Sequence, residues 1–259
     1  RPARHGGTML SRKAEAASSP VQTEEQMCQR AEEMFRRHKY NFVLVSSTNL
    51  DSIMEFYHHT PKGMHFVCDA YQAEVILTAM HGMERKGNYS QYQPSDGHST
   101  IWVKARHCPW SHLRRLGSSL KKPVEIAPMS DDKLKRAGFA MLVRKNTNPV
   151  RKTIFEEMRD EFYPLDGQII YSMWDGYLKP EHADRALIDF IGGAIEHLHT
   201  SGHAYVETIS RLIKTVRPKV IVPIHTERAD EFTAIPDFAP YRDRVRVLQD
   251  GEKLLLDEL

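Results

Sequence analysis

Three histidines in the last third of the chain have a spacing that suits metal and phosphate chemistry. His199 and His203 flank a turn of small residues, and His225 follows the apolar run 220–222. Ser201 in that turn is a good N-cap for a helix, and Gly202 lets the backbone approach a ligand closely. The apolar residues of the expected helix fall on one face: Val206, Ile209, Ile213 and Val216. Imidazoles placed in this way could bind a metal ion and a phosphate group; alternatively, they cap and pack the turn.

Alternating apolar strands and amphipathic helices are predicted to position these histidines. Strands are expected at residues 40–45, 64–68, 101–103, 139–143, 168–173, 195–198 and 220–222. Helices are expected at residues 24–38, 50–57, 70–85, 149–162 and 184–195. Residues 121–129 contain two prolines and are expected to be a connection. This alternation predicts a parallel α/β fold, in which ligands bind beyond the carboxyl ends of the strands.

The histidine segment resembles the carboxyl-terminal part of the metallo-β-lactamase-fold nucleases with a β-CASP insertion, most closely the ribonuclease J-like branch. Those proteins carry a His-x-Ser-Gly-His-Ala turn, then a helix, then a strand that ends in Pro, an apolar residue, His and a nearby Glu. The matching residues are His199, Ser201, Gly202, His203, Pro223, His225 and Glu227. Residues 45–51 and 169–177 and an expected closing hairpin at 247–256 extend the resemblance more loosely.

The resemblance implies a β-CASP-type parallel α/β domain plus the carboxyl-terminal part of a metallo-β-lactamase αββα fold. Residues 1–22 would be the end of the first lactamase segment, and residues 23–165 the β-CASP-like domain. Residues 166–259 would be the carboxyl-terminal metallo-β-lactamase segment, which the chain re-enters near Tyr163 and Pro164. These boundaries are expectations from the family.

The family also implies a mechanism, hydrolysis of phosphodiester bonds at a site of two Zn²⁺ ions, with Mn²⁺ or Mg²⁺ as alternatives. His225 would be a metal ligand, and Glu227 would orient such an imidazole. His203 would contact the phosphate and protonate the leaving oxygen, a task that suits a group with a pKa near neutrality. The phosphate would be held by His199, Ser201, Gly202 and His203.

One departure from the family bears on activity. The family's metal site is built mainly by a His-x-His-x-Asp-His loop, which this sequence lacks, and Gly6 stands where the family has an acidic residue. The chain begins with Arg1, and the missing loop would lie upstream. We therefore expect either the carboxyl-terminal portion of a longer enzyme or a relative that has lost its metal loop. A catalytic zinc needs about three protein ligands, so we expect this chain alone to be inactive.

A basic window indicates a nucleic-acid partner. Residues 97–124 contain no Asp or Glu, and aromatic side chains lie among their cations, as in tracks for single-stranded nucleic acid. An ordinary solvated face is the alternative. The strand-end turn at 46–49 and the re-entry loop at 169–177 contribute further candidates. Together with the window, the candidate nucleic-acid contacts are Ser47, Asn49, Lys104, Arg106, Trp110, Arg114, Arg115 and Trp174. Asn49 could equally be a plain N-cap, and Trp174 could plug an interface.

Composition narrows the class of protein. The chain has 259 residues, of which 41% are hydrophobic, and this is enough to form one sizeable core or two modest ones. Its net charge is +2. No apolar run approaches 18 residues, so no membrane span is expected. The three cysteines form no zinc pattern, and with no secretory signal evident they indicate a reduced cytoplasm. Single-stranded RNA is the expected partner. A non-catalytic RNA-binding scaffold and a hydrolase of small substrates remain alternatives, and a homodimer is left open.

Overall fold

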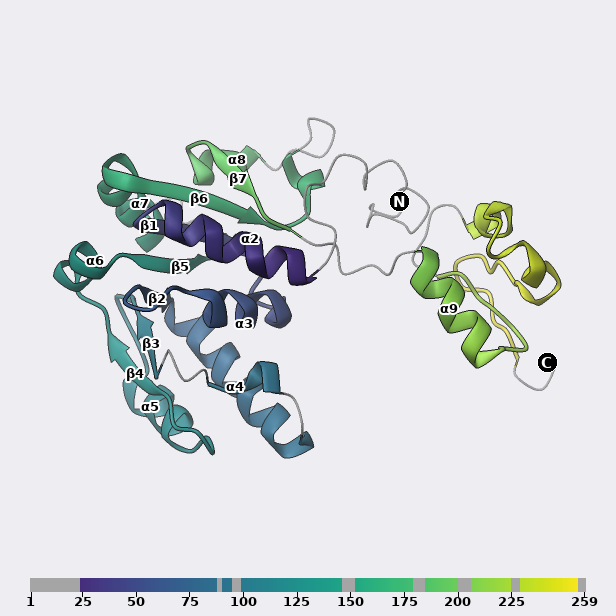
Figure 1. Ribbon diagram of the computed structural model, residues 1–259, viewed down its shortest axis with the longest axis horizontal. Helices are drawn as coiled ribbons and strands as arrows, with labels where there is room; N and C mark the ends of the chain where they lie inside the picture. The colour runs from purple at the N-terminus through teal and green to yellow at the C-terminus, as the bar shows by residue number, and fades with distance from the viewer. Residues whose placement is uncertain are drawn as a thin grey trace. The chain divides into compact units, whose positions relative to one another are not determined.

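The computed structural model describes residues 24–87, 90–94, 99–145, 152–178, 185–199, 206–224 and 229–255 (Figure 1). Contacts divide the chain into two compact units. Thr23–Thr200 form one unit, and Arg1–Gln22 together with Ser201–Leu259 form the other. None of the described helices is both long enough and apolar enough to cross a membrane.

The described part of Thr23–Thr200 is built on a seven-stranded sheet whose strands are all parallel. The strand order is β4-β3-β2-β5-β1-β6-β7. The strands are β1 (Tyr40–Val45), β2 (His65–Cys68), β3 (Thr100–Val103), β4 (Glu125–Pro128), β5 (Phe139–Val143), β6 (Gly167–Ser172) and β7 (Ile195–His197). The predicted parallel α/β class is thereby confirmed.

Helices cover both faces of this sheet. One layer contains α2 (Glu24–Arg37), α3 (Leu50–His59), α4 (Ala70–Lys86) and α5 (Trp110–Ser118), in which neighbouring helices contact each other. The other contains α6 (Asp131–Ala137), α7 (Ile154–Asp166) and α8 (Arg185–Ile191), whose apolar residues share one core cluster. A short 3₁₀ segment, η1 (Ser90–Tyr92), packs on α3 and α4, and another, η2 (Asp175–Leu178), follows β6.

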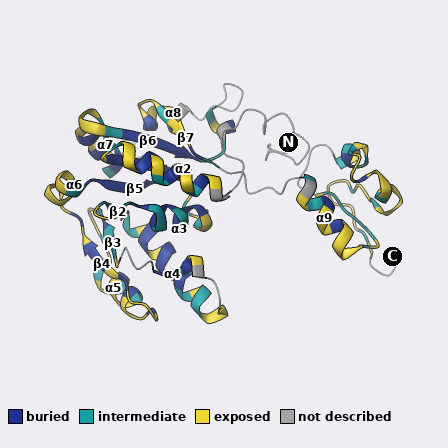
Figure 2. Cartoon of the chain, in the orientation of Figure 1, coloured by how far each residue is buried: buried dark blue, intermediate teal, exposed yellow. Residues whose placement is uncertain are grey.

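Burial on both faces explains why the central strands β1 and β5 are apolar at every position except Asn41. Every residue of β1 and β5 is buried (Figure 2). In β1, Tyr40, Phe42 and Leu44 point to the α7 side, where they join the core cluster with Phe139 and Phe162. The intervening Asn41 faces α2. Its side chain donates to the backbone carbonyl of His38 at 2.9 Å and so supplies a hydrogen bond to a carbonyl just after the end of that helix. The central strands therefore pack against a helical layer on each face of the sheet.

The order of the strands creates a switch point between β2 and β5. β2 continues through α4 to β3, whereas its neighbour β5 continues through α7 to β6 on the opposite side. α4 and α7 belong to different layers, so the two connections leave the sheet edge in opposite directions. In open α/β sheets, ligands bind in the crevice that such a divergence opens.

Several predicted elements match the structure closely. The strands at 40–45 and 139–143 have the predicted bounds, and Asn49 caps α3 as expected. The predicted connection at 121–129 is wrong, because Glu125–Pro128 pair with Thr100–Val103 as β4. The predicted helix 184–195 is too long: α8 ends at Ile191, and residue 195 begins β7. The short helices α5 and α6 were not predicted.

The second unit contains α9 (Val206–Val216) and two 3₁₀ segments, η3 (Ala229–Ala234) and η4 (Ala239–Arg244). Ile213 of α9 is buried in a small cluster with Phe232 and Phe238, whereas Val216, predicted on the same face, is 61% exposed.

Two strand predictions fail in the second unit. The predicted buried strand at 220–222 is wrong, because Ile221 makes only an isolated bridge to Val245 and residues 220–222 are half-buried. The predicted hairpin at 247–256 is also not seen, since residues 247–255 contain no strand. The αββα arrangement stays a prediction.

The predicted boundary between residues 165 and 166 also stays a prediction. Tyr163 and Pro164 lie within α7, and β6 begins directly after that helix, paired with β1. In the contact-based division, residues 166–200 accompany the sheet.

Candidate functional site

The carboxyl edge of the sheet collects most of the described candidate residues. Because all strands are parallel, the residues that follow them lie along one edge. Along that edge the described candidates are Lys104 and Arg106 after β3, Ser47 and Asn49 after β1, Trp174 after β6, and His199 after β7. The structure adds Asp69 after β2 and Arg144 after β5.

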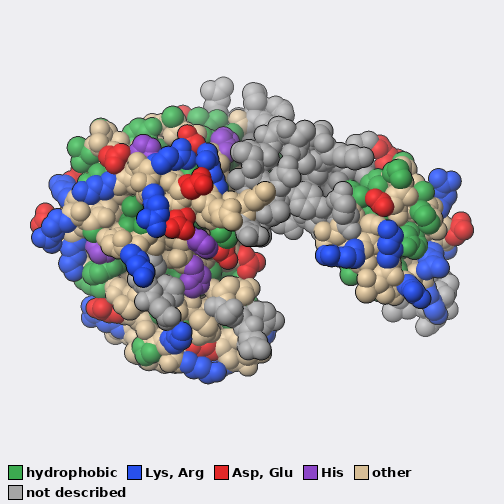
Figure 3. All heavy atoms as spheres, viewed as in Figure 1, with side chains coloured by type: hydrophobic (Ala, Val, Ile, Leu, Met, Phe, Trp, Pro, Cys, Tyr) green, Lys and Arg blue, Asp and Glu red, His purple; other side chains and the backbone are tan. Residues whose placement is uncertain are grey.

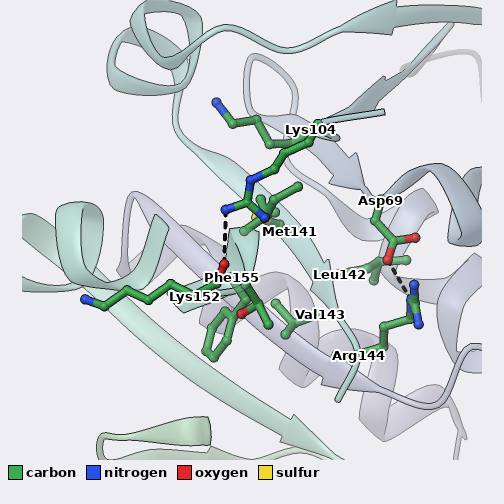
Figure 4. Close-up of a pocket in the computed structure, with 11 residues that line it drawn as sticks. Asp69, Lys104, Met141, Leu142, Val143, Arg144, Lys152 and Phe155 are labelled. Atoms are coloured by element: carbon green, nitrogen blue, oxygen red, sulfur yellow. Dashed lines mark hydrogen bonds and ion pairs between the residues drawn. The ribbon is translucent and has the colours of Figure 1, made fainter. Parts of the chain in front are cut away.

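A small pocket opens at the switch point (Figure 4). Its volume is about 160 Å³, and its floor contains the apolar side chains of Met141, Val143 and Phe155. Cationic side chains and the start of α7 complete the lining. Pockets for whole small-molecule ligands usually measure about 300–1,000 Å³, so this one suits a single group of an extended ligand.

An ion pair spans the crevice between β2 and β5. Arg144 Nε donates to Asp69 Oδ2 at 2.6 Å, and the two side chains face each other in Figure 4. The other Asp69 oxygen accepts from the backbone of Gln72 at 2.8 Å and caps α4. The Arg144 guanidinium also lies 4.8 Å from the centre of the Tyr71 ring. This arginine therefore bridges both sides of the switch point.

The start of α7 forms another wall of the pocket. Thr153 and Glu156 make a reciprocal capping box, with Thr153 N donating to Glu156 Oε2 at 2.7 Å. Arg106 donates to the carbonyl of Lys152 at 3.0 Å and also pairs with Glu157. Hydrogen bonding to Asp160, 2.6 Å away, raises the pKa of Lys152 and keeps it cationic.

Carboxylates from distant segments pair with two cations of the predicted nucleic-acid track. Lys104 pairs with Asp131, as Arg106 does with Glu157. On the face shown in Figure 3, blue and red side chains are interspersed over the sheet-containing unit. Two cations of the acid-free window 97–124 are therefore paired with carboxylates that lie outside that window.

The turn after β1 is ordered by its own side chains. Asn49 accepts from Ser52 N at 3.4 Å, and Ser46 Oγ lies 2.9 Å from Thr48 Oγ1. Ser47 Oγ is buried and has no hydrogen-bond partner among the described residues. Asn49 thus acts as the plain cap that was one of its two interpretations.

The remaining basic candidates lie on α5, away from the pocket lining. Arg114 sits over the Trp110 ring at 5.5 Å and donates to the carbonyl of Ile126 at 3.3 Å. Arg115 lies 3.1 Å from His112 Nδ1. Both arginines are exposed, whereas Trp110 is half-buried.

Trp174 packs inside its own loop. Its ring meets Tyr177 edge to face at 5.2 Å, and its carbonyl accepts from Tyr171 at 3.0 Å. A Cβ at Gly176 would come within 2.3 Å of two atoms of the Trp174 ring, so only glycine allows this packing. Both interpretations of this tryptophan, as a nucleic-acid contact and as an interface plug, stay predictions.

Most of the histidine motif lies outside the described residues. His199 follows β7 and is half-buried, whereas Ser201, Gly202, His203, His225 and Glu227 are not described. Within the described ranges, one group of side chains has metal-binding proximity, and none of its members belongs to the motif. The zinc assignment at the motif therefore stays a prediction.

Sequence reasoning missed Arg144 and Lys152. Arg144 comes directly after the apolar strand 139–143, and its position at a strand end was the available signal. Lys152 and Thr153 precede α7, whose start was predicted too early for the capping box to be recognised.

Comparisons with known proteins supply the remaining evidence. Residues 191–234 match the Zn-dependent metallo-hydrolase RNA specificity domain, a segment that includes every motif residue from His199 to Glu227. This supports the metallo-β-lactamase and β-CASP resemblance. The chain is also similar to a solved protein of unknown function from Enterococcus faecalis V583, with a TM-score of 0.53 and 20% identity. The alignment covers 92% of this chain and 48% of that chain, so this chain spans about half its length. No curated protein matches the chain.

Proposed function

We propose that this chain is the RNA-binding and carboxyl-terminal part of a metal-dependent nuclease of the ribonuclease J-like branch, which hydrolyses phosphodiester bonds in RNA. The observation that carries the proposal is the match of residues 191–234 to an RNA specificity domain of zinc-dependent metallo-hydrolases. That segment contains the two imidazoles, His203 and His225, to which the resemblance gives roles in phosphate and metal binding.

In this proposal the motif residues handle the scissile phosphate. His199, Ser201 and the backbone amides of Gly202 and His203 hold its oxygens, as helix starts do for anions. His203 gives a proton to the leaving oxygen. His225 and Glu227 would hold the metal and orient its ligand. Zinc, when bound, would supply a hydroxide at neutral pH.

The switch-point pocket would hold another part of the RNA. Its cations are engaged with partly exposed carboxylates, and exposed ion pairs contribute only about 0–1 kcal/mol. A phosphate can therefore replace a carboxylate at little cost, and arginine can bind it through two parallel hydrogen bonds. The apolar floor beneath would contact a base or a sugar.

The test of the catalytic part is cleavage of single-stranded RNA by the complete polypeptide that includes this chain, with Zn²⁺ or Mn²⁺. The variant His225→Ala is expected to lose cleavage together with about one of the two metal ions, because it removes a ligand. Metal content is measured by elemental analysis. Full cleavage and full metal content in this variant would contradict the assignment. RNA binding without any cleavage would favour the scaffold alternative.

The test of the RNA-binding part uses this chain as it stands. Lys152→Ala is expected to weaken binding to single-stranded RNA uniformly across sequences and to lower the salt-dependence slope by about 0.7, the contribution of one lost phosphate contact. Fluorescence anisotropy against salt concentration measures both. The matched control is Lys62→Ala, an exposed lysine before β2 at the opposite edge of the sheet. If the two variants behave alike, the pocket is not the RNA contact.

A further inference from the structure

A group of three potential metal ligands lies between α2 and α3, outside the pocket and outside the histidine motif. Cys28 comes from α2, and Glu55 and His59 come from α3. One ligand atom of each residue lies within 4.8 Å of the other two. The spacing of four residues places Glu55 and His59 on one face of α3, and the contacts between α2 and α3 bring the thiol to that face.

The distances between these atoms fit a small cation. Cys28 Sγ donates to Glu55 Oε2 at 2.7 Å, and His59 Nδ1 lies 3.4 Å from the same oxygen. Ligand bonds of about 2.0–2.3 Å at tetrahedral angles separate nitrogen and oxygen by roughly 3.4 Å and sulfur and oxygen by roughly 3.6 Å. The His59–Glu55 pair already has that separation. The thiol needs to move by about 1 Å, which side-chain rotation supplies.

The surroundings also favour a bound ion over a solvated surface group. The side chains of Glu55 and His59 are 26% and 31% exposed, and Cys28 is half-buried. His59 Nδ1 also donates to the Glu55 carbonyl at 2.9 Å, which holds the ring beside the carboxylate; metal binding would exchange this hydrogen bond for a bond to the ion, with the ring in its other tautomer. Each of the three residues is a regular zinc ligand, and a thiolate selects zinc, cobalt or cuprous copper over magnesium or calcium.

We propose that Cys28, Glu55 and His59 form a mononuclear site for a zinc-type divalent cation, with a fourth position left for water. Three protein ligands and one open position are the pattern of zinc sites that exchange a ligand. Binding replaces the thiol proton and the contact between Cys28 and Glu55 by bonds to the metal. Affinity therefore rises with pH, and the bound ion ties α2 to α3.

The test is titration of the chain with Co²⁺, which reports thiolate ligation by a sulfur-to-cobalt charge-transfer band. We expect the band at one equivalent, its displacement by Zn²⁺, and a rise in melting temperature with zinc. Cys28→Ser is expected to abolish the band. His59→Gln is expected to weaken binding more than roughly 100-fold, since even outer-shell partners contribute about 10–100-fold.

Matched controls separate this site from others. Cys108→Ser removes another half-buried thiol. His58→Gln removes the histidine next to His59; the ring of His58 bonds to the Gln91 carbonyl and not to Glu55. Both should leave the band unchanged. Burial raises the pKa of the Cys68 thiol, so that residue is a poor ligand. The cysteines are Cys28, Cys68 and Cys108, so the motif at 199–227 cannot produce a thiolate band, and the result is independent of the proposed nuclease.

Three results would overturn the site. The first is the absence of the charge-transfer band from the unaltered chain at stoichiometric cobalt. The second is a band that survives Cys28→Ser, and the third is a band that disappears in Cys108→Ser. Circular dichroism of each variant shows whether the chain is folded. The conservative variant Glu55→Gln supplies a further readout, since it keeps the size of the side chain and should still weaken zinc binding through the lost charge.

Discussion

Replacing His203 with alanine is expected to lower metal-dependent RNA cleavage by the complete polypeptide about 10²–10⁴-fold, the usual contribution of a general acid. In the proposed mechanism this imidazole protonates the leaving oxygen. The metal ligands remain in place, so metal content should be retained. Single-turnover cleavage of a labelled RNA under excess enzyme measures the chemical step directly.

The pH profile separates proton transfer from a positioning role of His203. If His203 is the acid, the limb of the profile that reports its deprotonation should disappear in the variant, whereas a lost phosphate contact would lower the rate evenly at all pH values. His38→Ala is the control: this exposed histidine precedes β1 at the opposite edge of the sheet and pairs with Asp166 at 2.9 Å. Cleavage by His203→Ala equal to that of the control would remove the catalytic assignment.

The strands that were predicted with their observed bounds, 40–45 and 139–143, are buried along their whole length. Apart from Asn41 they are apolar, because helices cover them on two sides. β4 was missed because Pro128 closes it. As an edge strand paired only with β3, it can end in a residue that has no N–H to donate. A local pattern cannot show that a strand lies at an edge.

The segment 220–222 illustrates the opposite error. Its three β-branched residues have the composition of a buried parallel strand, yet Ile221 bridges one residue, Val245, and stays half-buried. Burial of a strand requires neighbours on both sides, and those neighbours are not encoded in the strand itself. The loss of this strand is the main reason why the second unit was predicted less well than the first.

The predicted basic track could not be judged from the charges of its own segment. The window 97–124 is basic when considered alone, but Lys104 and Arg106 meet carboxylates that are 27 and 51 residues away in the chain. The pocket at the switch point instead involves Arg144 and Asp69, two strand-end residues that the reversal in strand order brings together. Chain topology, rather than the local count of charges, determines which charged side chains meet at this edge of the sheet.

The same topology predicts where the fold is most sensitive to loss of packing. Leu44→Ala is expected to reduce the free energy of unfolding by about 3–5 kcal/mol, the range of buried Leu→Ala substitutions that leave a cavity. Leu44 is 1% exposed, lies in the central strand β1, and belongs to the core cluster shared by the sheet and α7. Urea unfolding followed by circular dichroism measures the change through a lower midpoint at constant slope.

The control for Leu44→Ala is Leu165→Ala in α7, which removes the same atoms from a side chain that is 63% exposed. Its effect is expected to stay within about 0.5 kcal/mol, because there is no cavity to open and alanine favours the helix. Equal effects of the two substitutions would mean that β1 is not packed between two helical layers. Because Asn49 and Ser47 follow β1 directly, a protein without that packing would also lose the turn that places them at the sheet edge.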